Sequence, residues 1–142
     1  MVEFVLVDAE SVRPVRRAVL APDGGRVRLT WPGDADERAM HFGVRDGEQL
    51  VAVATLVHEQ VGELGSEVWR ARGPFVLETQ RRQGYGRRLL QALQAVAEKR
   101  GGGLWVRAPI SALAFFSSQG FKAGSDAGSG DEDLLLVWHP KA

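Results

Sequence analysis

The sequence predicts a single mixed α/β domain whose sheet is antiparallel in its first half and gains a helical crossover in its second half. The length of 142 residues suits one hydrophobic core, so we expect one domain over residues 1–142. Asp46-Gly47 joins two apolar runs and is a strong hairpin signal, because both residue types tolerate positive φ. One long amphipathic helix pattern, from Gly84 to about Arg100, lies between two further apolar runs, as a crossover helix does.

Composition and charge exclude several kinds of protein. The chain contains no cysteine, which excludes disulfides, thiolate nucleophiles and zinc–thiolate sites and suits the reducing cytoplasm. The formal net charge is zero, so no global field attracts nucleic acid or an anionic membrane. No apolar run approaches the roughly 18 residues that span a bilayer, and the N-terminus lacks the features of a signal peptide. We therefore expect a cytoplasmic protein without a metal site, whose partners include neither nucleic acid nor a membrane.

The first half of the chain reads as three strands and one helix. The helix follows the first strand and holds Pro14 in its first turn, where proline is tolerated. We expect Arg16, together with the other arginines of this helix, to lie outside its apolar face. Residues 26–37 read as a loop that is expected to be mobile. The strands are expected at residues 2–7, 40–45 and 49–57.

The second half contains an anomaly at Pro74. Residues 67–77 read as a fourth strand, yet proline cannot donate to a β-ladder and belongs at edges or bulges. If this strand is central, it should bulge or part from its neighbour near Pro74 and leave backbone groups free for a ligand. We expect Ser111 to cap a short helix that ends at Gly120. Turns are expected at residues 62–66 and 124–130, and further strands at 104–108, from Phe121 onward, and at 133–138, which closes the sheet.

The start of the long helix carries the residues most suited to chemistry. Gly84 and Gly86 have no Cβ, so the backbone can approach a ligand closely there. The first N–H groups of a helix lack intrahelical partners, and with four nearby arginines they make a receptor for phosphate or pyrophosphate. A solvated, basic helix start with a tight turn explains the same residues. A P-loop is excluded because Arg87-Arg88 stand in place of Lys-Ser/Thr, and a dinucleotide fingerprint because Leu89 replaces its third glycine.

Two motifs, in this order, resemble those of the GNAT superfamily of N-acetyltransferases. The acetyl-CoA motif of that superfamily, Gln/Arg-x-x-Gly-x-Gly/Ala after the fourth strand, is matched from Arg81 to Gly86. Its later motif, Ala-x-x-Phe-Tyr-x-x-x-Gly-Phe, is matched from Ala112 to Phe121 with one change. The resemblance covers most of the chain and extends to a bacterial subgroup of small proteins with mostly unassigned substrates. It implies a mostly antiparallel sheet of about six or seven strands, splayed between the fourth and the fifth, with helices on both faces.

By this resemblance, the cofactor site would be built mainly from the backbone. N–H groups from Arg82 to Arg87 would hold the CoA pyrophosphate, and the main chain of Phe75 and Val76 would pair with the pantetheine arm like an added strand. The N–H of Val76 could polarise the thioester carbonyl. The cofactor-binding residues implied in this way are Phe75, Val76, Arg81, Arg82, Gln83, Gly84, Tyr85, Gly86, Arg87 and Arg88.

The sequence departs from the family pattern at two places in the expected pocket. Many members have a tyrosine, placed to protonate the leaving CoA thiolate, where this chain has Phe116, which carries no hydroxyl. Ser117 or Ser118 could substitute, although both also read as ordinary helix-surface residues. Arg107-Ala108-Pro109 stands where the subgroup tends to have Asn-Ala-Arg. Either the substrate differs or activity is reduced; a general acid typically contributes about 10²–10⁴-fold.

Candidates for the base and for substrate binding each have a structural alternative. His41 can titrate near neutrality, and Glu78 lies near the expected site. On a strand, however, a histidine is more often a structural residue with satisfied hydrogen bonds, and Glu78 also reads as a solvated residue of the turn. Arg72 and Arg107 could bind a carboxylate of the acceptor, whereas Arg72 could instead form a structural salt bridge.

The sequence thus predicts an N-acetyltransferase that moves acetyl from acetyl-CoA to a primary amine of a small molecule or peptide by direct attack. The alternative is a CoA-binding regulatory module with the same fold and little or no turnover. A nucleic-acid binder using the arginines is disfavoured by the zero net charge. The chain could be a monomer or a homodimer, with the apolar strand at residues 134–138 pairing across the dimer.

Overall fold

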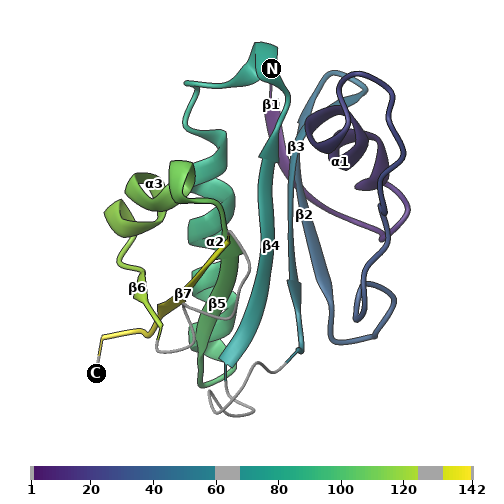
Figure 1. The fold of residues 1–142 in the computed structure, drawn as a ribbon. Helices are drawn as coiled ribbons and strands as arrows, with labels where there is room; N and C mark the ends of the chain where they lie inside the picture. Colours follow the sequence, from purple (N-terminus) through teal and green to yellow (C-terminus); the bar gives the residue numbers. More distant parts are fainter. Residues whose placement is uncertain (1, 60–67, 125–132, 142) are drawn as a thin grey trace.

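The computed structural model describes residues 2–59, 68–124 and 133–141 of the chain and is built around a seven-stranded sheet (Figure 1). The strand order is β1-β2-β3-β4-β5-β7-β6, and neighbours run antiparallel except β4 and β5, which run parallel. The strands are β1 (Val2–Val7), β2 (Met40–Asp46), β3 (Gln49–Val57), β4 (Val68–Val76), β5 (Gly103–Ala108), β6 (Lys122–Ala123) and β7 (Leu134–Trp138). This is the mixed, mostly antiparallel sheet that the sequence predicted.

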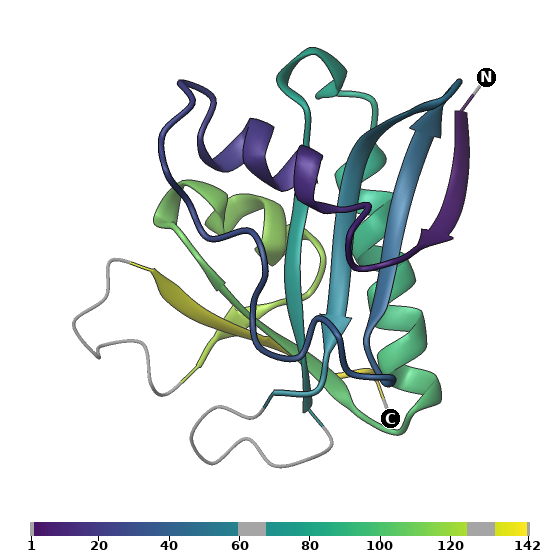
Figure 2. The same cartoon turned by 90° about the vertical axis from the view of Figure 1, so that its right-hand side faces the viewer.

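Helices cover both faces of the sheet (Figure 2). The helix α1 (Arg13–Leu20) packs on one face, and the longer α2 (Tyr85–Lys99), which connects β4 to β5, packs on the other. The short helix α3 (Leu113–Ser118) follows β5. Two 3₁₀ turns, η1 (Glu78–Gln80) and η2 (Ile110–Ala112), precede α2 and α3.

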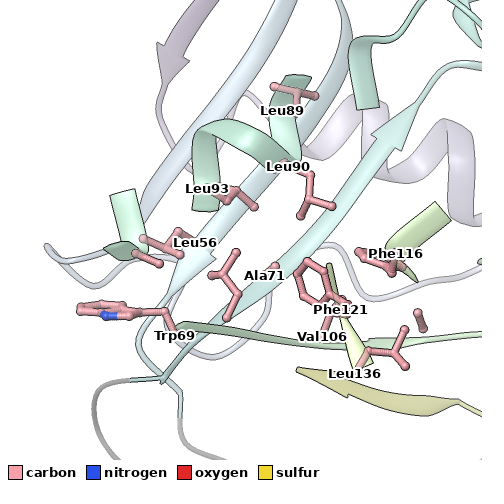
Figure 3. Packing of buried hydrophobic residues seen from close by; sticks show 14 of the residues in the cluster. Leu56, Trp69, Ala71, Leu89, Leu90, Leu93, Val106, Phe116, Phe121 and Leu136 are labelled. Carbon is pink, nitrogen blue, oxygen red and sulfur yellow. The ribbon is translucent and has the colours of Figure 1, made fainter. Parts of the chain in front are cut away.

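The core lies mainly between α2 and the sheet (Figure 3). Leu90 and Leu93 of α2 are fully buried against β3 and β4, where Leu56 and Ala71 are also buried. Because successive strand residues point to opposite faces, Val53 of β3 contributes instead to a smaller cluster with α1. The sheet is therefore enclosed between two helices at its centre.

Two predicted turns are confirmed, and one predicted cap is wrong. Gly47 adopts a φ of +64° in the β2–β3 hairpin, and Gly120 adopts +91° just after the end of α3. Ser111, however, does not cap α3. The chain enters α3 through η2, whose Ala112 N–H donates to the Pro109 carbonyl at 2.9 Å, and the N-cap is Ala112 itself.

The prediction for Arg16 is also wrong, because the side chain is 1% exposed. Arg16 lies one helical turn after the buried Val12, on the face of α1 that meets the sheet. An ion pair makes its burial possible: Arg16 Nη1 donates to Asp34 Oδ2 at 2.6 Å. Asp34 belongs to the segment that the sequence marked as a loop, so this loop is anchored to α1.

The expected irregularity at Pro74 is confirmed. The register between β3 and β4 shifts between Val53 and Thr55, opposite the Gly73–Pro74 step. On the other side, the described pairing of β4 with β5 covers Val68–Arg70 and Gly103–Trp105. Beyond these residues β5 turns away from β4 (light green and teal in Figure 2), and this edge of β4 has no described strand partner.

The last strand does not lie at a sheet edge. β7 lies between β5 and β6, so it is not placed for the edge pairing across a dimer that the sequence suggested. The turn expected at residues 62–66, and most of that expected at 124–130, lie outside the described residues. Within the described chain, no helix combines the length and the apolar character that a membrane span requires.

Candidate functional site

The loop between η1 and α2 turns the chain through two left-handed residues. Arg82 has a φ of +68° and Gly84 a φ of +82°, and Gly84 is the N-cap of α2. Arg88 N–H is the first to bond back along the helix, to the Gly84 carbonyl at 3.1 Å. The N–H groups from Tyr85 to Arg87 therefore precede the intrahelical ladder and can donate to an anion.

Gly86 leaves room where the loop meets the sheet. A Cβ at this position would contact Val76 Cγ2 at 3.6 Å, and Pro74 and Phe115 at 3.8 Å. The glycine thus opens a narrow space between β4, α2 and α3.

The loop lines a cavity of about 560 Å³. The cavity is basic, because three arginine side chains lie on its wall and the described lining contains no acidic residue. Gln83 and Arg88 are not part of the described lining. The Arg88 guanidinium lies 3.8 Å from the centre of the Phe4 ring, on the β1 side of α2. The lining residues are Val76, Gln80, Arg81, Arg82, Gly84, Tyr85, Gly86, Arg87, Phe115, Ser118 and Gln119.

A second cavity, of about 730 Å³, occupies the cleft between β4 and β5. Val76, Arg81, Gly86 and Phe115 line both cavities, so the two are adjacent. The wall of the second is mostly apolar and includes the end of α1, the bulged part of β4, the end of β5 and α3. The basic loop and the cleft between β4 and β5 therefore lie next to each other.

Arg81 lies where the two cavities meet. Its Nε–H donates to the Val76 carbonyl at 3.2 Å, although the side chain is exposed. On the β3 side, Phe75 and Val76 pair with Val53 and Ala52. The edge of β4 that faces the cleft is therefore occupied at Val76 by Arg81, a flexible side chain rather than a neighbouring strand.

The residues of α3 present an apolar wall. Phe116 is 4% exposed, lines the second cavity, and packs edge-on against Phe115 and Phe121. Ser117 is exposed and is not among the described lining residues. Ser118 lines the first cavity, but its hydroxyl donates to the Phe115 carbonyl at 2.6 Å. Ser111, which the sequence assigned to a helix cap, instead lines the second cavity.

His41 belongs to a buried network on the α1 side of the sheet. Its Nε2 lies 3.0 Å from the Asp34 carbonyl, which can only accept, so Nε2 carries the proton. In the neutral ring Nδ1 then accepts from the Thr55 hydroxyl at 2.8 Å, and Thr55 Oγ1 accepts from Arg16 Nη2 at 3.1 Å. Both ring nitrogens are used within the fold, and His41 is absent from the described lining of either cavity.

Asp34 is the acid of this network and was missed by the sequence reading. Burial favours its protonated form, but hydrogen bonds from Arg16 and the Trp31 N–H outweigh burial and lower the pKa of Asp34. The signal available in the sequence was a single aspartate beside Trp31-Pro32-Gly33. Glu78, the other candidate base, is exposed at the start of η1 and is not among the described lining residues.

Arg72 is held behind the cleft rather than in it. It donates to Glu59 Oε1 at 2.7 Å and to the Pro32 carbonyl at 3.0 Å, and Arg70 pairs with the other oxygen of Glu59. Burial, followed by the charge of Arg70, lowers the pKa of Arg72 to about 10. Arg107 of β5, in contrast, lines the second cavity.

Comparison with known proteins identifies a family. A family model described as "Acetyltransferase (GNAT) family" matches residues 10–121 of the chain. No curated protein is significantly similar to the chain in sequence.

Several solved structures share the fold at low sequence identity. ElaA of Escherichia coli is 15% identical, with a TM-score of 0.78 over 97% of this chain and 99% of that one. An acyl-CoA N-acyltransferase from Pseudomonas aeruginosa is 14% identical, with a TM-score of 0.77 over 99% of this chain and 100% of that one. N-acetylglutamate synthase from Neisseria gonorrhoeae, solved with coenzyme A and N-acetyl-glutamate, is 16% identical, with a TM-score of 0.73 over 100% of this chain and 36% of that one.

Proposed function

This chain belongs to the GNAT acetyltransferase family, and we propose that it moves the acetyl group of acetyl-CoA to a primary amine of a small molecule or peptide. One observation carries the proposal: the basic loop at the start of α2 opens directly into a cleft walled by the bulged edge of β4. The pyrophosphate and the extended arm of CoA match these two features in the same order. The Neisseria structural relative, which was solved with coenzyme A, supports the proposal.

In this proposal, the thioester of acetyl-CoA supplies the activated acetyl group. Backbone N–H groups of the loop and of the first turn of α2 hold the pyrophosphate, and the side chains of Arg82 and Arg87 add charge. The main chain of Phe75 and Val76 pairs with the pantetheine arm. Arg81 has to release the Val76 carbonyl as the arm enters, which frees its guanidinium for the phosphates.

Transfer is direct, because the chain has no cysteine to carry the acetyl group. The acceptor nitrogen bonds to the acetyl carbon while the carbon–sulfur bond breaks, and the nitrogen gives one proton to water in the cleft. The N–H of Val76 stabilises the charge that develops on the carbonyl oxygen. Phe116 cannot protonate the departing sulfur, so its proton comes from water in the open cleft.

The acceptor enters from the α1 side of the cleft. Val19 and Leu20 form an apolar rim there, and Leu20 is 42% exposed. Arg107 lies on the opposite wall, where it suits an acceptor that carries a carboxylate. Arg72 contributes indirectly, because its bonds to Glu59 and Pro32 fix β4 immediately before the bulge.

A CoA-binding module with little or no turnover is the second candidate. Phe116 offers no hydroxyl, and neither His41 nor Glu78 lies among the described residues that line the cavities. The two candidate bases are thus outside the described lining of both cavities, and the residue at the family's usual general-acid position is apolar. This arrangement is compatible with ligand binding alone.

Calorimetric titration with acetyl-CoA and with CoA tests the shared part of both candidates. We expect the parent protein to bind both ligands and Gly84→Glu to bind neither, because a carboxylate enters the phosphate loop. Thr79→Glu is the matched control, since it adds the same charge at an exposed residue outside the described lining. Lack of binding by the parent protein contradicts the enzyme and the module together.

Release of free CoA thiol separates the two candidates. The cysteine-free chain contributes no thiol of its own, so the assay has no protein background. Amine-dependent thiol release, with a panel that includes amino acids, peptides and simple amines, supports the enzyme. Binding without amine-dependent release across the panel supports the module.

We also propose a cytoplasmic location, because a chain without cysteine suits a reducing compartment. The zero net charge favours a small anionic ligand over nucleic acid.

A further inference from the structure

The two edges of the sheet are protected very differently. The β6 edge has two residues, one of them Lys122, and such short, charged edges resist pairing with other chains. The β1 edge has six residues, VEFVLV, without proline or lysine, and it pairs with β2 without a register shift. Its outer side therefore presents a straight row of backbone donors and acceptors, with no neighbour among the described residues.

An apolar stripe runs along this open edge. Val2, Phe4 and Leu6 are 36%, 37% and 62% exposed, and together they are three of the five exposed large hydrophobic residues in the described chain. Because they alternate along the strand, they share one face. That face is the α2 side, since the Phe4 ring lies 6.2 Å from the Tyr85 ring and beneath the Arg88 guanidinium.

We propose that β1 pairs antiparallel with β1 of a second copy of this chain. The two-fold axis of this dimer passes midway between the two Phe4 residues. In an antiparallel pair, directly opposite residues point to the same face. Pairing centred on Phe4 places Phe4 opposite its own copy and Leu6 opposite Val2 of the partner. All three exposed side chains of each copy then meet their counterparts. The single charge on the strand, Glu3, lies on the other face, opposite Val5.

This self-complementarity favours a second copy over an unrelated partner. Centring the axis one residue later, on Val5, would place Val2 opposite Asp8 of the partner and bring an apolar side chain against a carboxylate. The Phe4-centred register avoids this contact and closes into a two-fold dimer, the commonest symmetric assembly. Such a dimer requires neither catalysis nor CoA binding.

Sedimentation equilibrium over a range of protein concentrations tests the association. We expect a reversible monomer–dimer equilibrium, and Leu6→Lys should raise its dissociation constant by roughly tenfold or more, because each dimer loses two apolar contacts and gains two desolvated charges. The control is Ile110→Lys, which changes the most exposed large hydrophobic residue in the described chain (71%) far from β1 and should leave the equilibrium unchanged. The Arg88 side chains of the two copies lie on the same face and repel each other. Added salt screens this repulsion, so it should strengthen the dimer.

Cysteine cross-linking tests the register, since the chain has no cysteine of its own. Opposite Cα atoms in an antiparallel pair lie about 4.5–5.5 Å apart, within the range of a disulfide. Phe4→Cys should therefore oxidise to a covalent dimer. Leu6→Cys should not, because its own copy lies about four residues, or 13 Å, away. The double variant Val2→Cys, Leu6→Cys should cross-link again.

Two results overturn the proposal. One is a monomeric mass at every concentration in the parent protein, with circular dichroism showing a folded chain. The other is a dimer formed in a different way. A dimer that Leu6→Lys leaves intact has its interface elsewhere, and a dimer in which Leu6→Cys cross-links and Phe4→Cys does not has another register.

Discussion

Asp34 shows, at the scale of single residues, how a buried charge fixes a loop. Hydrogen bonds from Arg16 and the Trp31 backbone oppose the effect of burial and hold the pKa of Asp34 below its ordinary value of 3.8. A depressed folded-state pKa means that the ion pair contributes fully above about pH 4 and is lost as the pH falls through the folded-state pKa. Part of the acid sensitivity of this fold therefore belongs to one carboxylate.

We predict that Asp34→Asn lowers the free energy of unfolding at pH 7 by about 3–5 kcal/mol, because Arg16 is left buried without its charge partner. The loss should shrink below pH 4, where the parent carboxylate also becomes protonated. Urea unfolding at several pH values measures both effects. Asp36→Asn in the same loop is the control, since Asp36 pairs with the exposed Arg38 and should matter little at pH 7.

Phe116 is the second residue whose chemistry can be tested alone. If proton delivery to the departing thiol limits turnover, Phe116→Tyr should raise kcat by at most about 10²–10⁴-fold, the usual contribution of a general acid. Affinity for CoA should not change, because the ring stays packed between Phe115 and Phe121. Steady-state rates and calorimetry measure the two quantities. An unchanged kcat with an intact fold shows that proton delivery to sulfur does not limit the rate.

At the scale of elements, the two glycines before and within α2 have separable functions. Gly84 needs its left-handed φ of +82°, whereas a Cβ on Gly86 would meet its neighbours at ordinary distances of 3.6–3.8 Å. Gly84→Ala should therefore lower the free energy of unfolding by about 1–2 kcal/mol, and Gly86→Ala should leave it nearly unchanged. Chemical unfolding of both variants measures these free energies. Equal losses would show that Gly86 is as constrained as Gly84 and would contradict the separation of their functions.

Elements defined by local signals could be predicted from the sequence. The β2–β3 hairpin follows from Asp46-Gly47, and the departure of β4 from β5 follows from Pro74, because backbone chemistry acts within a few residues. The glycine and arginine loop before α2 was found for the same reason. The cap assigned to Ser111 failed although its signal is local, because Pro109 starts a 3₁₀ turn that moves the helix start by one residue.

Side chains whose partners are distant in sequence could not be placed in this way. Arg16 looked like a solvated residue because Asp34, its partner, lies 18 residues further on. The ring of His41 is held by Thr55, 14 residues away, and Arg72 by Glu59, 13 residues away. His41 and Arg72 carry a titratable or charged group, so the sequence also offered these two residues as functional candidates. Pairing through the fold is what separates structural from functional charges here.

At the scale of the whole molecule, bound CoA should stabilise the fold, because its extended arm would lie between β4 and β5. From Val68 to Arg70, β4 is paired with β5. After Arg70 the two strands are separated by the cleft. A ligand that binds the folded chain alone stabilises it by about 2.7 kcal/mol at a hundred times its dissociation constant. We predict that saturating CoA raises Tm by several degrees in the parent protein and not in Gly84→Glu, as thermal unfolding followed by circular dichroism will show.

The open edge of β4 also has a pharmacological consequence. A strand edge recognises any extended backbone that offers matching donors and acceptors, and in the proposed function the adjoining loop holds a phosphate. A short extended peptide with a phosphate at one end would satisfy both features without containing a nucleotide. Such a strand mimic is a starting point for an inhibitor that competes for the donor site while leaving the acceptor side of the cleft free.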